Sequence, residues 1–75
     1  MGRLKPTPYR EVRRKLIADG FVEVSQRGSH VKFMRKDAQG TRIVIVPKHT
    51  ADIPIGTLRS ILNQAGLTPD DFDQL

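Results

Sequence analysis

A histidine that follows a glycine and a serine is the residue of this sequence best placed to do chemistry. The stretch Gln26-Arg27-Gly28-Ser29-His30 sets an imidazole beside a hydroxyl, a glycine and a cation. Glycine adopts backbone angles that other residues avoid, so a ligand can approach the main chain closely there. An imidazole exchanges a proton near neutral pH, so His30 can act as an acid or as a base.

Cleavage of RNA is a reaction that these residue types suit. In it, a base removes the proton from a 2′-hydroxyl group, and the oxygen then attacks the neighbouring phosphate. Lys32 or Arg27 would offset the negative charge that builds up on the phosphate in the transition state. On residue types and spacing alone, a lone histidine at the start of a strand is also often an ordinary surface residue, and that alternative stays open.

Other kinds of histidine site are only weakly indicated. Ser29 is too close to His30 in sequence to stand for a catalytic triad, and no carboxylate is obviously placed to orient the ring. Two histidines nineteen residues apart, without any cysteine, make a weak metal site. His49 would approach His30 if the third expected strand lies beside the second. It would then be a second acid or a phosphate contact; otherwise it is a polar loop residue.

The positive charge is concentrated around this stretch. Residues 1–48 contain twelve Lys or Arg against four acids, a net charge of +8, whereas residues 49–75 contain Arg59 against four Asp, a net charge of −3. A focused positive surface attracts nucleic acid or an acidic protein, and salt weakens that attraction. The alternative is a basic surface that only keeps the chain in solution.

The elements that hold His30 follow from the spacing of the apolar residues. A helix is expected from Thr7-Pro8, with the Thr7 hydroxyl as its cap, to Asp19, because Tyr9, Val12 and Leu16 form one apolar stripe. Strands are expected at residues 21–25, 30–36 and 41–46. A second helix is expected from Gly56-Thr57 to Gly66, and Thr68 should cap a short C-terminal helix.

The second strand decides where the candidate site faces. Its two-residue period sends Val31 and Phe33 to the core and His30 and Lys32 to the opposite side. On the third strand, Ile43 and Ile45 face one way. The sequence therefore predicts an α+β fold in which residues 1–75 form one domain. Its three-stranded antiparallel sheet has two helices on one face and His30 on the other.

Composition limits the class of protein. A chain of 75 residues buries only about 60% of its unfolded surface, which leaves little room for a deep enclosed site. It contains no cysteine, so neither a disulfide nor a thiolate zinc site is expected, which suits a reducing cytoplasm. The longest apolar run, Ile43 to Val46, is four residues, and we expect no membrane contact and no cofactor.

The residues around His30 also resemble a known family. Four segments occur in a fixed order: Gly20-Phe21 with Gln26 to His30, Val46 to His49, Gly56 to Leu62, and Ala65-Gly66-Leu67. Together they strongly resemble the HicA family, the messenger-RNA interferase toxins of HicA–HicB toxin–antitoxin systems, over nearly the whole chain.

The resemblance implies a function as well as a fold. It implies an αβββα fold similar to a double-stranded RNA-binding domain, with His30 as the catalytic residue. It also implies metal-independent cleavage of messenger RNA in the cytoplasm and neutralisation by a HicB-type antitoxin that covers the active face. We expect the RNA contacts to be Arg27, Gly28, Ser29, Lys32, Lys48 and His49, and we expect the free protein to be a monomer.

Two segments depart from the commoner family pattern. Where many relatives have a histidine-proline-aspartate-glycine turn, this chain has the turn Arg35 to Gly40. Residues 50–55 lack the lysines of many relatives, and with them the cations that a phosphate contact from that loop would use. A non-catalytic RNA-binding module is the alternative. Against it, the second helix opens Gly56-Thr57-Leu58-Arg59, with one cation where a duplex-binding domain has a lysine cluster.

Overall fold

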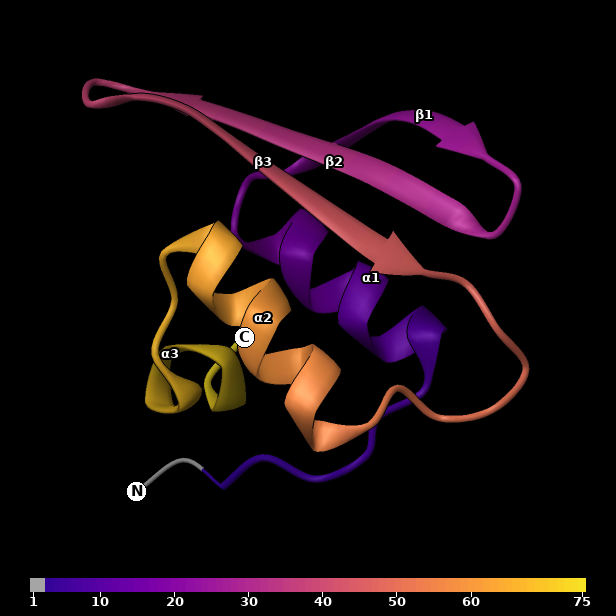
Figure 1. Ribbon diagram of the computed structural model, residues 1–75. Coiled ribbons are helices and arrows are strands. Elements are labelled where there is room, and N and C mark those ends of the chain that lie inside the picture. The colour runs from indigo at the N-terminus through magenta and orange to yellow at the C-terminus, as the bar shows by residue number, and fades with distance from the viewer. Residues whose placement is uncertain (1–2) are drawn as a thin grey trace.

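The computed structural model describes residues 3–75 as one helix, three strands and two further helices (Figure 1). The predicted domain of residues 1–75 includes two residues outside this range. The elements are α1 (Tyr9–Ala18), β1 (Val22–Arg27), β2 (His30–Asp37), β3 (Gly40–Pro47), α2 (Ile55–Ala65) and α3 (Pro69–Asp73). The predicted α+β class and αβββα order are confirmed.

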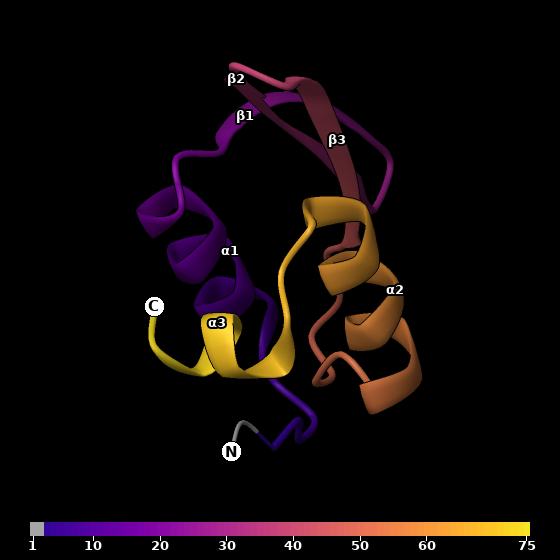
Figure 2. The same cartoon turned by 90° about the vertical axis from the view of Figure 1, so that its left-hand side faces the viewer.

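The sheet and the helices form two layers. The strands are antiparallel in the order β1, β2, β3, so β2 is central and His30 starts the central strand. Figure 2 shows the sheet at the top, with α1 and α2 below it and α3 beside them. Within residues 3–75, all three helices lie on the same side of the sheet, and its other face is uncovered.

Alternation along the strands builds the core under the sheet. Val31 and Phe33 on β2 are fully buried, as the two-residue period predicts. Val44 and Val46 on β3 lie opposite them and are also fully buried. The helices add their apolar stripes: Tyr9, Val12 and Leu16 from α1, and Leu58, Ile61, Leu62 and Ala65 from α2. Ile43 and Ile45 do share a face, and it is the uncovered one.

An extra residue in β1 changes which side chains face outward. The register runs Glu23 opposite Phe33 and then Ser25 opposite Lys32, so Val24 is a β-bulge with no partner of its own. The bulge shifts the rest of β1 by one residue. It therefore sets Ser25 beside Lys32 and Arg27 beside His30 on the uncovered face.

Two predicted helix starts were wrong in detail. Pro8 is the N-cap of α1, and no side chain caps that helix. The Thr7 hydroxyl instead donates to the Lys5 carbonyl oxygen at 2.7 Å, because the Thr7 backbone is held in a bridge with Ile53 (N to O distances of 3.1 and 2.7 Å). The second helix begins at Ile55, directly after Pro54, rather than at Gly56.

The predicted C-terminal cap of α2 and the predicted N-terminal cap of α3 agree with the structure. Gly66 is left-handed, with φ 73°, and the Leu67 N–H donates to the Leu62 carbonyl at 2.9 Å, which completes a Schellman cap. At α3, Thr68 and Asp71 cap each other reciprocally. The Thr68 backbone N–H, and then its hydroxyl, hold the pKa of Asp71 below its ordinary value.

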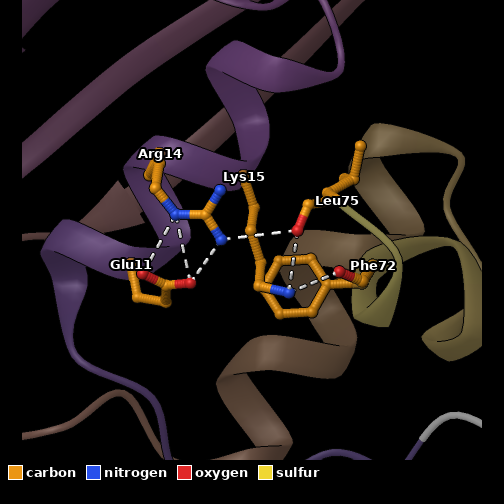
Figure 3. A network of polar contacts seen from close by, with 5 residues as sticks. All are labelled: Glu11, Arg14, Lys15, Phe72 and Leu75. Carbon is orange, nitrogen blue, oxygen red and sulfur yellow. Dashed lines mark hydrogen bonds and ion pairs between the residues drawn. The ribbon is translucent and has the colours of Figure 1, made fainter.

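The C-terminal residues are anchored on α1 rather than left to fray. The Lys15 ammonium donates to the Phe72 carbonyl oxygen at 2.7 Å and lies over the Phe72 ring (Figure 3). Arg14 is paired with Glu11 at 2.5 Å and also donates to the Leu75 carbonyl oxygen at 3.3 Å. These contacts fix α3 on the helical side of the molecule, away from His30.

Candidate active site

His30 stands at the start of β2 with its side chain exposed on the uncovered face. It lies directly opposite Arg27 on β1 and Pro47 on β3. We expected about four residues between the first two strands, but β1 continues to Arg27 and only Gly28 and Ser29 separate them. Gly28 has a φ of 58°, which suits the primed turns that join two strands tightly. Arg27 is therefore a strand residue next to His30 rather than part of a loop.

Two hydrogen bonds hold the turn that carries His30. The Gln26 side-chain amide donates to the Gly28 carbonyl oxygen at 3.0 Å. The Lys48 backbone N–H donates to the Ser29 carbonyl oxygen at 2.6 Å. The second bond ties the chain after β3 to the turn, so motifs far apart in the sequence meet at one place.

A surface hollow of about 540 Å³ lies beside His30 on this face. It is lined by Ser25, Gln26, Arg27, His30, Lys32 and Ile45. Three of the residues predicted for the site, His30, Arg27 and Lys32, are thus brought together. Gln26 belonged to the stretch singled out in the sequence but was given no role there, and sequence reasoning missed Ser25 and Ile45. The alternation of the third strand had predicted that Ile45 shares a face with Ile43, and this could have indicated Ile45. The β-bulge that places Ser25 on this face does not interrupt the apolar pattern of the first strand, so the sequence could not indicate Ser25.

The other predicted RNA contacts lie outside the lining of the hollow. Gly28 and Ser29 form the turn next to it. The Lys48 ammonium lies 5.5 Å from the centroid of the Tyr9 ring, so this side chain points toward α1. Burial, and then the nearby Glu23 carboxylate, raise the pKa of Tyr9, so the ring stays neutral beneath the cation. His49 is exposed in the segment after β3, and its contact with RNA remains a prediction.

The charges on the uncovered face are all of one sign. Arg27, Lys32 and Lys36 occupy outward positions of β1 and β2, together with His30. Among the described strand residues, the carboxylates Glu23 and Asp37 alternate to the other side of the sheet. Glu23 pairs there with Arg13 at 3.4 Å. A polyanion therefore meets cations and an imidazole on this face without a fixed negative charge among them.

Within residues 3–75 there is no group of three or more His, Cys, Asp or Glu side chains that could hold a metal ion. None of the helices in that range combines the length and the apolar composition that crossing a membrane requires.

Comparison with known proteins identifies the family. The model of a family described as the HicA toxin of bacterial toxin–antitoxin matches residues 9–67, which is more than three quarters of the chain. The match runs from the first residue of α1 to the residue after Gly66, so it includes the hollow and the turn before His30. A comparison with curated protein sequences gave no match. The chain therefore belongs to the HicA toxin family of bacterial toxin–antitoxin systems.

Proposed function

We propose that this toxin is an endoribonuclease that cleaves messenger RNA, with His30 as its catalytic residue. The observation that carries the proposal is the hollow in which His30 stands exposed with Arg27 and Lys32. An exposed imidazole among cations is suited to a substrate that brings both a phosphate and a proton to remove. The family is one of toxins, and cleavage of messenger RNA would stop translation and growth.

The proposed reaction needs one proton removed and one supplied. His30 takes the proton of a 2′-hydroxyl group, and the oxygen forms a bond to the adjacent phosphorus. The bond to the 5′-oxygen of the next nucleotide breaks, which leaves a 2′,3′-cyclic phosphate and a free 5′-hydroxyl. The leaving oxygen takes up a proton, for which Lys32, His49 and water are the candidate donors.

Arg27 and Lys32 would stabilise the charge that develops during this step. Arg27 is directly opposite His30, and Lys32 is the next residue on the same face of β2. Facing residues of paired strands lie ~5 Å apart, and successive residues on one face lie ~6.6 Å apart. Those spacings are similar to the distance between neighbouring phosphates of an RNA strand, so both cations can contact the substrate while His30 reacts.

The proposed function also includes a protein partner, the oligomeric state of the free toxin and its location in the cell. A HicB-type antitoxin would neutralise the toxin by covering the uncovered face, and the free toxin would be a cytoplasmic monomer. Family membership supports the existence of an antitoxin partner. The cations around His30 support an acidic one.

Removal of either cation tests the proposal. With EDTA present throughout, we expect the purified protein to cleave messenger RNA. Arg27→Gln and Lys32→Gln should each slow single-turnover cleavage by about 10- to 100-fold, less than the 10²–10³-fold loss typical of a buried oxyanion donor. Arg59→Gln is the matched control, because Arg59 is an exposed cation on α2, on the helical side, and its variant should cleave at the wild-type rate.

Two results would count against the proposal. The first is cleavage that occurs only after a divalent metal is added, because the imidazole would then not be the group that activates the nucleophile. The second is RNA binding without any cleavage, which is the behaviour of a non-catalytic RNA-binding module.

A further inference from the structure

We infer that the end of the uncovered face away from His30 is an apolar docking surface for the antitoxin and that it is separable from the cleavage site. The inference rests on the proposed function. Val22, Met34 and Ile43 lie side by side in register across the three strands, and we call them the apolar row. The partner that fits presents an apolar surface bordered by carboxylates.

The apolar row is unusually exposed for side chains of its kind. Val22 is 58% exposed and Ile43 is 43% exposed, with the partly buried Met34 between them. Of the large hydrophobic residues that are exposed in the described chain, all but Ile17 lie on the sheet. Apolar residues that gather on one side of a small protein, bordered by charges, are typical of a binding surface.

RNA bases are a poor match for the apolar row. Proteins bind unpaired bases by stacking them on aromatic rings or on guanidinium planes. The chain has four aromatic residues, Tyr9, Phe21, Phe33 and Phe72, and all of them are buried beneath the sheet or between the helices. A row of Val, Met and Ile instead suits the side chains of another protein.

A second copy of this chain is also a poor match. A two-fold contact between two uncovered faces would bring Arg27, Lys32 and Lys36 of both copies together, with no carboxylate on that face to offset them. An acidic border on the partner would meet those cations instead. Charge complementarity therefore favours an acidic partner over self-association.

The edge of β3 is partly closed to an added strand. The Gln64 side-chain oxygen accepts a hydrogen bond from the Ile45 backbone N–H at 2.9 Å, at a point where that N–H faces away from β2. An incoming strand would have to displace this contact before it could pair there. We therefore expect the partner to pack on the sheet face rather than to extend the sheet beyond β3.

Distance along β2 separates the two parts of the face. Met34 is four residues beyond His30, or about 13 Å at 3.3 Å per residue. Neither Val22 nor Ile43 lines the hollow beside His30. The apolar row can therefore be changed without changing the residues proposed to act on RNA.

The test uses the double variant Val22→Thr, Ile43→Thr, which keeps β-branched side chains on the strands. The probe is the purified protein encoded by the reading frame next to this toxin, titrated by calorimetry. We expect roughly a 10- to 100-fold loss of affinity for that protein, with RNA cleavage at the wild-type rate and growth arrest no longer neutralised. Ile17→Thr is the control, because Ile17 is as exposed as Ile43 (42% against 43%) but lies on α1, and this variant should bind the partner normally.

The outcomes separate the two proposals. Wild-type affinity of the double variant would overturn the docking surface, and so would a loss of cleavage as large as the loss of binding. An equal loss of affinity in Ile17→Thr would also overturn it, because the effect would then not belong to the sheet face. If the wild-type protein fails to cleave RNA, the proposed function fails, yet the calorimetric comparison still decides whether the apolar row binds the partner.

Discussion

Replacement of His30 by alanine is expected to lower RNA cleavage by about 10²–10⁴-fold, the range typical of a lost general acid or base, and to abolish growth arrest. The fold should remain intact. The His30 side chain is exposed and contributes to no hydrophobic cluster, and surface substitutions of this kind usually change stability by less than about 0.5 kcal/mol. The loss would therefore be one of chemistry and not of structure.

Three measurements on the same preparation separate those two causes. They are single-turnover cleavage of a defined RNA, far-UV circular dichroism and urea unfolding. His49→Ala is the comparison variant, because it removes the other histidine, which is exposed but does not line the hollow. We expect it to lose much less activity than His30→Ala. A folded His30→Ala protein that cleaves RNA at the wild-type rate would refute the assignment of His30.

Phe33→Ala should have the opposite pattern, with loss of the fold as its primary effect. Phe33 is fully buried at the centre of β2, the central strand. Truncation of a buried phenylalanine costs about 3–5 kcal/mol. Domains gain only about 0.05–0.15 kcal/mol of stability per residue, or about 4–11 kcal/mol for 75 residues. This single change therefore removes a large part of the total stability.

Met34→Ala is the matched control for Phe33→Ala. Met34 is the next residue of β2, but it faces the uncovered side and is only partly buried. We expect its free energy of unfolding to fall by about 1 kcal/mol or less, measured by urea denaturation. Equal losses in the two variants would contradict the assignment of the core to the helical side of the sheet.

The faces of the central strand could be predicted because burial leaves a period of two in the sequence. Val31 and Phe33 alternate with His30 and Lys32, and the structure places the first pair in the core and the second pair outside. The Schellman cap at Gly66 could also be predicted, because a glycine directly after the apolar stripe of a helix is typical of the left-handed residue that ends it.

The features that the sequence did not reveal depend on contacts between distant residues. The apolar and polar residues of 22–25 alternate as in an unbroken strand, so the sequence did not mark the bulge at Val24 that places Arg27 opposite His30. The Thr7 hydroxyl could cap a helix, but the β-bridge between Thr7 and Ile53 keeps the Thr7 backbone out of the N-cap position of α1. The bond from the Lys48 N–H to Ser29 joins residues nineteen positions apart. Local propensity carries no information about such pairs.

A substrate that lacks the 2′-hydroxyl group tests most directly whether His30 acts by removing the proton of that group. Single-turnover cleavage by the purified toxin would be compared on two RNAs that differ by one 2′-deoxynucleotide at the mapped cleavage position. We predict that the deoxy site is not cut while other sites in the same RNA are cut normally, and that the products of the unmodified RNA end in a 2′,3′-cyclic phosphate. Cleavage of the deoxy site at the rate of the unmodified site would contradict the account.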